Sequence, residues 1–475
     1  MRRGPSPPIR ILGKGPWSLL PARTWSLITD FFIFGFGLSI FYYVVVLASR
    51  WFGPFNPQVE ISLSPGMLPV YAAYSLLRIT VAYTLSLGFT LVYGYVAAYN
   101  SRAERLMIPL LDILQSIPVL SFLPGVMLAM VALFPRSELG VELGAILLIF
   151  TGQVWNMAFS FYSSLKSIPR DMREAATIYQ FNWYQRFTNI ELPYAAIGLV
   201  WNSMMSVAGG WFFLMACEMF VLGDKDFRLP GLGSYLQTAA SAGDTRSILW
   251  GIFTMILVIV LMDQVIWRPV IAWAEKFKME QVESANAPQS WFLNLIEGSR
   301  GLVALRKRVF RPVREWMALR FARQYHEADR NAPPTAWKVW LGRIIAAVAV
   351  CAVVYAVVRA SGMLSQLSAA EYKEMFAGAF ATFLRVVTAL IIGSAWTIPV
   401  GVAIGFNPKL ARIAQPLAQI AASVPATALF PVVLLLLIKI GGGLGIGSVV
   451  LLLLGTQWYI LFNVIAGAMA IPTDL

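Results

Sequence analysis

Residues 78–118 read RITVAYTLSLGFTLVYGYVAAYNSRAERLMIPLLDILQSIP, and residues 385–425 read RVVTALIIGSAWTIPVGVAIGFNPKLARIAQPLAQIAASVP. The two stretches align without a gap and share arginine, glycine, asparagine and proline at matching positions. Chance would not keep so many of these residue types in register, so the stretches are two copies of an internal repeat. The matched pairs are Arg78 with Arg385, Gly94 with Gly401, Asn100 with Asn407, Arg105 with Arg412, and Pro109 with Pro416.

Long apolar runs surround both copies. Of the 475 residues, 58% are hydrophobic and only 13% are charged, and the mean hydropathy is +0.68. A soluble fold of this length cannot bury so much apolar surface, so the composition excludes the soluble enzyme classes. The sequence predicts an all-α polytopic membrane protein with about ten transmembrane helices. The predicted spans are about 29–49, 70–99, 106–133, 143–165, 194–222, 247–274, 338–360, 374–406, 412–440 and 444–466.

The number of crossings between the two copies fixes their relative orientation. About six crossings separate the span of Arg78 from the span of Arg385, and an even number inserts both copies the same way. We therefore expect two parallel repeats related by a pseudo-two-fold axis along the membrane normal. Such an arrangement places a solute pathway between the halves, although other carriers also contain parallel repeats.

The distribution of basic residues predicts the orientation in the membrane. The net charge is +13, and Lys and Arg concentrate before residue 29, at 100–105, at 166–186 and at 276–337. The loop at 51–69 contains neither residue. The positive-inside rule therefore places the N-terminus and the 276–337 segment in the cytoplasm, and it explains the charge more simply than a nucleic-acid partner does.

Residues 167–193 read SIPRDMREAATIYQFNWYQRFTNIELP and follow the fourth predicted span. Pro169 suits a helix start, and Asp171 and Glu174 suit the positive end of a helix dipole. Asn182 can cap a second short helix. The residues predict a helix–turn–helix that projects from the bilayer toward a partner. A re-entry loop lying on the membrane surface is the alternative.

This loop resembles the EAA loop of permease subunits in binding-protein-dependent ABC importers. Its spacing matches the family pattern E-A-A-x3-G-x9-I-x-L-P, except that a glutamine stands at the glycine position. The upstream sequence also resembles the nitrate, sulfonate and taurine branch of that family. The resemblance covers about 70–275 and 377–475. It implies an ATPase-coupling role for Glu174, Ala175, Ala176, Gln180, Ile190, Leu192 and Pro193.

The resemblance implies a type I ABC importer permease fold in a bacterial inner (plasma) membrane. In that family, two separate ATPase subunits use ATP and magnesium, and a periplasmic or extracellular binding protein delivers the solute. The sequence has no G-x4-G-K-[ST] phosphate loop, so we expect no bound cofactor and no enzymatic activity in this chain. The implied solute is a small anion or zwitterion such as nitrate, sulfonate, taurine or bicarbonate.

The same resemblance divides the chain. Because Leu475 aligns with Met172, the second copy stops before its own Glu-Ala-Ala, and we expect it to be incomplete in this sequence. The expected segments are an N-terminal cytoplasmic segment with the first helix and outer loop (1–69), the first permease domain (70–275), a basic cytoplasmic linker (276–337), a leading helix (338–376) and the second permease domain (377–475).

Ionisable residues inside predicted spans are candidates for the pathway, because their burial in lipid is costly. Arg78 and Arg385 form a symmetric pair that can draw an anion inward. Alternatively, their side chains can reach the outer headgroups. Glu218 and Asp263 can pair with an arginine or bind solute, and Asp112 lies near the membrane interface.

Proline breaks provide the remaining pathway candidates. Pro118 and Pro425 interrupt predicted helices, and each lies two residues after a serine, Ser116 or Ser423. Such breaks are tolerated where the freed backbone lines a cavity. The serines can satisfy that backbone or contact solute.

Two other classes of function compete with an importer subunit. An ion-gradient-driven secondary transporter also has parallel repeats, but it needs deep titratable groups, which are sparse here. A membrane-embedded enzyme needs clustered His, Asp or Cys. Cys217 and Cys351 lie far apart in sequence and His326 is the only histidine, so no metal site is predicted.

Overall fold

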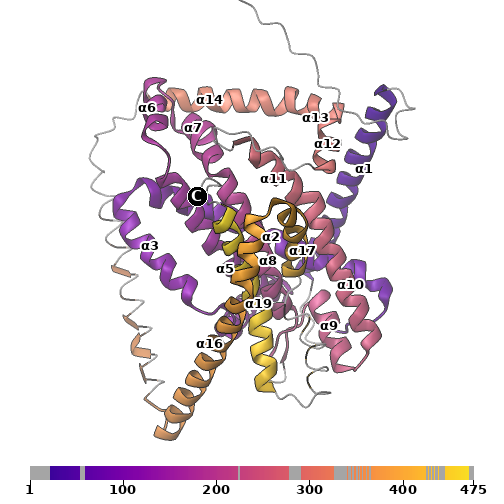
Figure 1. Ribbon diagram of the computed structural model, residues 1–475, viewed down its shortest axis with the longest axis vertical. Coiled ribbons are helices and arrows are strands. Elements are labelled where there is room, and N and C mark those ends of the chain that lie inside the picture. The colour runs from indigo at the N-terminus through magenta and orange to yellow at the C-terminus, as the bar shows by residue number, and fades with distance from the viewer. Residues whose placement is uncertain are drawn as a thin grey trace, which may run out of the picture.

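The computed structural model describes residues 22–53, 59–222, 225–277, 290–325, 365–423 and 444–469, with single helical positions between 340 and 362 and between 426 and 437. The regular elements among these residues are helices, apart from one small antiparallel pair, β1 (Val221–Leu222) with β2 (Lys225–Asp226). Figure 1 shows the helices gathered in one bundle. The helices of the first half are α1 (Ala22–Ser49), α2 (Leu68–Tyr99), α3 (Ser101–Ser116), α4 (Leu123–Leu133), α5 (Leu139–Lys166), α6 (Arg170–Ile178), α7 (Trp183–Arg186), α8 (Leu192–Glu218), α9 (Leu232–Ser241), α10 (Thr245–Met262) and α11 (Arg268–Ala274).

The second part of the chain is also helical where it is described. Much of the predicted linker forms three helices, and the second repeat contributes three longer ones. The linker helices are α12 (Trp291–Glu297), α13 (Arg300–Leu305) and α14 (Arg311–Tyr325), and the later helices are α16 (Ala369–Phe406), α17 (Pro408–Ser423) and α19 (Leu444–Met469).

Seven helical runs among the described residues are long and apolar enough to cross a membrane. Each corresponds to one of the predicted spans. They are Thr29–Phe52, Pro65–Tyr99, Leu139–Lys166, Trp183–Glu218, Thr245–Ala274, Ala369–Phe406 and Gly445–Ile465. Of the other predicted spans, 338–360 falls largely outside the described residues, and 412–440 is described as part of α17 up to Ser423 and only at single positions beyond it.

The predicted span at 106–133 is not a single helix. α3 ends at Ser116, and a short 3-10 turn, Val119–Ser121, separates it from α4. Pro118 causes the break, because it lacks an N–H and forces the residue before it, Ile117, into an extended conformation. The sequence predicted that Pro118 interrupts a helix, and the structure shows that two separate helices, α3 and α4, flank it.

The core of the first half is formed by α2, α5 and α8, which lie side by side (Figure 1). A cluster of buried apolar residues joins these helices to α9 and α10; it includes Ile79, Ile149, Trp211, Tyr235 and Met255. We call the end of the bundle that carries residues 167–193 the loop end. The opposite end, where α2 and α5 begin and α8 finishes, is the far end.

The described part of the linker lies at the loop end. α14 runs across this end of the bundle, at the level of α6 (Figure 1). It contacts α7 directly, because Asn182 Nδ2 donates a 3.1 Å hydrogen bond to the carbonyl oxygen of Ala318. The start of α13 is held on α1, where Asp30 accepts hydrogen bonds from Ser299 and from the backbone of Gly301.

The two repeats share local structure as well as sequence. Asn100 Oδ1 caps α3 by accepting from the backbone N–H groups of Arg102 and Ala103 at 3.1 and 3.2 Å. Asn407 Oδ1 caps α17 in the same way, accepting from residues 409 and 410 at 3.0 and 3.2 Å. The repeated asparagine thus performs the same function in both copies.

Matched glycines also allow the same close helix approach in each copy. A Cβ on Gly94 would lie 2.7 Å from Phe161 Cδ1 on α5, and a Cβ on Gly401 would lie 2.8 Å from Val464 Cγ1 on α19. Phe161 and Val464 occupy equivalent positions of the two copies. The crossing of α2 with α5 therefore matches the crossing of α16 with α19.

We expect Gly94→Ala to destabilise the protein while Gly88→Ala does not. Both glycines lie on α2, but a Cβ on Gly88 would meet nothing within 4 Å. Overpacking at residue 94 should lower the free energy of unfolding by about 1–3 kcal/mol, whereas alanine at residue 88 should leave it unchanged or raise it by about 1 kcal/mol. Thermal unfolding of the purified variants in detergent measures the difference, and equal melting of the two variants would contradict the close approach.

Candidate coupling loop and translocation cavity

Residues 167–193 form the helix–turn–helix expected from the sequence. α6 follows Pro169 and lies beyond the end of α5 (Figure 1). α7 begins with a capping box, in which Asn182 Oδ1 accepts from the Gln185 backbone at 2.8 Å and Gln185 Oε1 accepts from the Asn182 backbone at 3.1 Å. The prediction that Asn182 caps the second helix is confirmed.

The turn between the two short helices forms although a glutamine stands at the family's glycine position. Gln180 has φ +51° and is the one non-glycine residue with positive φ in the part of the chain that the structure describes. The Phe181 N–H donates to the Ala176 carbonyl at 2.9 Å and the Gln180 N–H to the Thr177 carbonyl at 3.0 Å. This is the usual helix-ending motif for a left-handed residue, and here a β-carbon is tolerated at a cost of about 1–2 kcal/mol.

The alanines of the loop allow a close approach from outside. Glu174 is exposed, Ala175 is half-buried and Ala176 is buried. A cavity of about 620 Å³ lies inside the loop, lined in part by Ala176, Gln180 and Ile190. A partner at this surface would meet the Glu174 carboxylate first.

Leu192 and Pro193 do not begin a separate helix. The helical run starts at Trp183, passes through a π-helical turn at Phe187–Glu191 and continues as α8 to Glu218. Pro193 lies in the first turn of α8, within this longer helical run. The wider π-helical turn lies immediately before Pro193. Because proline has no N–H, one backbone hydrogen bond of the helix is missing there.

A polar cluster around the buried Glu191 ties the base of this loop to α2. Arg186 Nε lies 2.7 Å from Glu191 Oε1 as an ion pair. The Tyr99 hydroxyl donates to the same carboxylate oxygen at 2.7 Å, and Arg186 Nη2 donates to the Tyr95 hydroxyl at 3.1 Å. Because Tyr95 and Tyr99 belong to α2, a displacement of the loop must also move α2.

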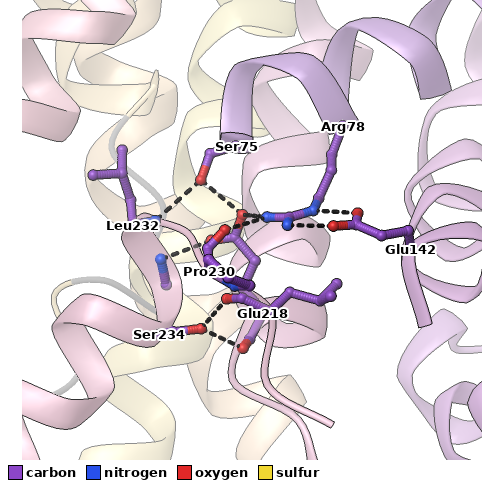
Figure 2. Close-up of polar contacts among 9 residues, drawn as sticks. Ser75, Arg78, Glu142, Glu218, Pro230, Leu232 and Ser234 are labelled. Atoms are coloured by element: carbon purple, nitrogen blue, oxygen red, sulfur yellow. Dashed lines mark hydrogen bonds and ion pairs between the residues drawn. The ribbon is translucent and has the colours of Figure 1, made fainter. Parts of the chain in front are cut away.

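Arg78 lies in a second buried cluster, toward the far end (Figure 2). Its Nε and Nη2 atoms donate to both carboxylate oxygens of Glu142, at 2.6 and 2.7 Å, and its Nη1 donates to Glu218 Oε1 and to the Pro230 carbonyl, each at 2.8 Å. Glu218 Oε1 also accepts from Ser75 Oγ at 2.7 Å. The cluster therefore joins α2, α5 and α8.

This geometry corrects one interpretation of Arg78. The side chain of Arg78 is fully buried and does not reach the lipid headgroups. Glu218 pairs with an arginine, which was one of its two alternatives. The partner Glu142 was not assigned from the sequence, although an acidic residue in the first turns of an apolar span indicates a buried ion pair. Glu138 lies at the edge of this cluster, and its burial and the nearby Glu142 carboxylate raise its pKa.

The repeat does not reproduce this cluster. Arg385 is exposed, and Gly445 stands at the position equivalent to Glu142. The two arginines thus have different surroundings despite their matched positions. The side chains of Ser423 and Pro425, the other candidates in the second copy, lie outside the described residues.

A polar cavity of about 560 Å³ opens between α3, α5 and α8, nearer the loop end. Most of its polar lining comes from one face of α5, and Asn202 on α8 donates to Ser160 Oγ at 3.0 Å. The residues that line it are Asp112, Gln115, Asn156, Phe159, Ser160, Ser163, Ser164, Ser167 and Asn202.

The sequence analysis missed this cavity. Its signal is a row of amide and hydroxyl side chains at helical spacing within an apolar span, from Asn156 to Ser167. Ser116 lies beside the cavity residue Asp112 and donates to its backbone carbonyl at 2.7 Å. Ser116 therefore satisfies local backbone, and Pro118 ends the helix that carries Asp112.

Comparisons with known proteins agree with this architecture. Residues 90–266 match the family described as the binding-protein-dependent transport system inner membrane component. A putative aliphatic sulfonates transport permease protein of Bacillus subtilis (strain 168) is 23% identical over 222 residues, covering 46% of this chain and 75% of that protein. A trimethylamine N-oxide transport system permease protein of Pelagibacter ubique (strain HTCC1062) is 25% identical over 275 residues, covering 56% of this chain and 33% of that protein. A nitrate import permease protein of Synechocystis sp. (strain ATCC 27184 / PCC 6803 / Kazusa) is 22% identical over 211 residues, covering 44% and 72%.

The family match spans the C-terminal end of α2, all of α5, α8 and α10, and the whole loop at 167–193. Residues 90–266 are therefore similar to the inner membrane component of binding-protein-dependent transport systems. This similarity and the candidate spans among the described residues are those of a multi-pass inner-membrane permease component of binding-protein-dependent ABC transport.

We expect Arg78→Leu to destabilise the protein strongly and Arg385→Leu to leave its stability almost unchanged. Removing Arg78 leaves two carboxylates unpaired inside the bundle, which should cost about 3–5 kcal/mol. The exposed Arg385 should cost within about 0.5 kcal/mol. Thermal unfolding of both variants measures this difference, with Glu142→Gln as a milder probe of the cluster. Similar melting of all three variants would show that the cluster does not hold the helices.

We expect Gln180→Gly to stabilise the loop and Gln180→Ala to leave it unchanged. Glycine removes the left-handed strain and should gain about 1 kcal/mol after its own entropic cost, whereas alanine retains the β-carbon. Amide hydrogen exchange of α6 and α7 is the direct measurement. Faster exchange in Gln180→Gly than in the unmodified protein would contradict a strained turn.

Proposed function

We propose that this chain forms the solute pathway of an ATP-driven importer and couples to separate ATPase subunits through residues 167–193. The observation that carries the proposal is the exposed helix–turn–helix beyond the end of α5, with Glu174 and Ala175 accessible on α6. The likeness of residues 90–266 to an inner membrane transport component supports it.

The stiffness of the loop supports a coupling role. α6 is closed by a hydrogen-bonded turn, α7 begins with a capping box, and a π-helical turn continues without interruption into α8. The contacts of Arg186 and Glu191 with two α2 tyrosines extend this rigid body into the bundle. A push on Glu174, Ala175 and Ala176 would therefore move α2 and α8 together.

The proposed partners follow from this arrangement. Two ATPase subunits bind ATP and magnesium and dock at the loop end, and a solute-binding protein docks at the far end. The loop end, with its basic linker helices, faces the cytoplasm together with the N-terminus, in agreement with the positive-inside rule.

We further propose that the second half repeats the first, giving about ten spans around a pseudo-two-fold axis. The matched caps at Asn100 and Asn407 and the matched close approaches at Gly94 and Gly401 support this symmetry. In this arrangement Arg385, Ser423 and Pro425 face the pathway from the second half. Arg78 and Glu218 border it at the far end by holding α2, α5 and α8 together.

The proposed solute is a small anion or zwitterion. The relatives' names contain aliphatic sulfonates, trimethylamine N-oxide and nitrate, all small and polar. An ion-gradient-driven carrier is the alternative. Solute uptake into vesicles that contain this chain alone, driven by an ion gradient without ATP, would favour that alternative.

We expect Glu174→Arg to reduce co-purification with the ATPase subunits by about tenfold or more, because the reversed charge opposes docking. Glu297→Arg on α12 is the matched control, since Glu297 is also an exposed carboxylate at the loop end. Both variants are purified from membranes of cells that make the whole transporter, and bound ATPase is quantified. Full retention of ATPase by Glu174→Arg would refute the docking role, and equal loss from both variants would show that the effect is not specific to the loop.

A further inference from the structure

We propose that the solute carries no net negative charge, so that of the two solute classes above the zwitterion is the one transported. The inference rests on the proposed function, because it takes the polar cavity between α3, α5 and α8 as part of the solute pathway. It is carried by the charge of the groups that line this cavity.

Asp112 is the one ionisable residue among the nine described residues that line the cavity. Gln115 Nε2 donates to Asp112 Oδ1 at 3.1 Å, which orients the carboxylate on α3. The other lining groups are serine hydroxyls, amides and the exposed ring of Phe159. The cavity thus presents one negative charge beside neutral donors and acceptors.

The basic residues near this end of α5 are engaged elsewhere. Lys166 Nζ lies 2.8 Å from Glu104 Oε2, and the Tyr162 hydroxyl donates to the other oxygen of Glu104. The hydrogen bonds from Lys166 and Tyr162 lower the pKa of Glu104, so this carboxylate remains charged and balances the lysine. Arg173 Nη2 donates to the carbonyl oxygens of Leu165 and Lys166 at 2.9 and 3.2 Å.

A free anion is therefore poorly matched to this cavity. A nitrate or a simple sulfonate would meet the Asp112 carboxylate with no lining cation to offset the repulsion. A zwitterion places its cationic end between Asp112 and the face of Phe159, which attracts a quaternary or protonated nitrogen. Its anionic end then accepts a hydrogen bond from the Ser163 hydroxyl.

The second copy of the repeat adds no positive charge at the equivalent positions. Gln419 stands at the position of Asp112, and the aromatic and polar character of residues 159 and 160 is kept as Phe462 and Asn463. The remaining equivalents are Ala422, Tyr459, Ala466, Gly467 and Ala470. At the eight lining positions whose equivalents fall within this sequence, a pathway built from both halves would thus contain one carboxylate and no cation.

The inference is tested by the reactivity of single cysteines, which requires no knowledge of the solute. Cys351 and the buried Cys217 are first replaced in the full chain by Ser and Ala. Ser163→Cys is then introduced on the cavity side of α5, and Leu147→Cys on an exposed apolar position of the same helix serves as the control. Membrane vesicles are treated with a cationic trimethylammonium-ethyl and an anionic sulfonatoethyl methanethiosulfonate of similar size.

We expect both reagents to modify Ser163→Cys and neither to modify Leu147→Cys. The cationic-to-anionic rate ratio at Ser163→Cys, divided by the same ratio for a free small thiol, should be about tenfold or more. Adding Asp112→Asn should return this normalised ratio to near one. Access of the reagents to Ser163→Cys tests the pathway, and the rate ratio tests the charge inference.

If neither reagent reaches Ser163→Cys, or both react equally with Leu147→Cys, the cavity is not an aqueous route and the proposed pathway fails. If both reagents reach Ser163→Cys at the free-thiol ratio, or the anion reacts faster, the pathway stands and the charge inference is overturned. A high ratio that survives Asp112→Asn would also overturn it, because the selectivity would not come from this carboxylate.

Discussion

The first half of this protein depends on a single guanidinium buried between two carboxylates. Arg78 binds Glu142 in a two-point contact and Glu218 through a third hydrogen bond, and it thereby joins three spans that have few other polar contacts at the far end. Inside a bilayer no water can replace a lost partner, so each polar group of a span needs an internal one. A buried pair is costly to assemble, but it is more costly to break.

This constraint separates structural polar groups from functional ones. Arg78 and the Arg186–Glu191 pair have partners within the protein, and both clusters join helices to each other. The serines and Asn156 on α5, in contrast, line a cavity, where water or solute can satisfy them. Sequence alone indicated Arg78 as a pathway candidate and did not indicate the serine row on α5. The surroundings show that Arg78 joins helices and that the serines line a cavity.

The sequence predicted the elements whose causes are local. The apolar runs gave seven spans near their observed positions, and Pro169 and Asn182 predicted the start of α6 and the cap of α7. The features that the sequence did not predict have non-local causes. Whether Pro118 kinks or breaks a helix depends on what receives the freed chain, and the partner of Arg78 lies 64 residues away on α5. Gln180 shows a related limit, because bonds closed by the whole loop hold it in a conformation that glutamine alone disfavours.

The two copies of the repeat are alike where they cross and different where they are charged. Gly94 and Gly401 permit the same helix approach, and Asn100 and Asn407 the same cap, so backbone geometry is shared. The buried ion cluster of the first copy has no equivalent at Gly445, and the crossing in the second copy is supported instead by an edge-to-face contact of Trp396 with Trp458. A duplicated unit therefore needs to keep only the residues that set its backbone path. The charged and cavity-lining positions are then free to diverge, so one half can carry a carboxylate where the other carries a neutral amide.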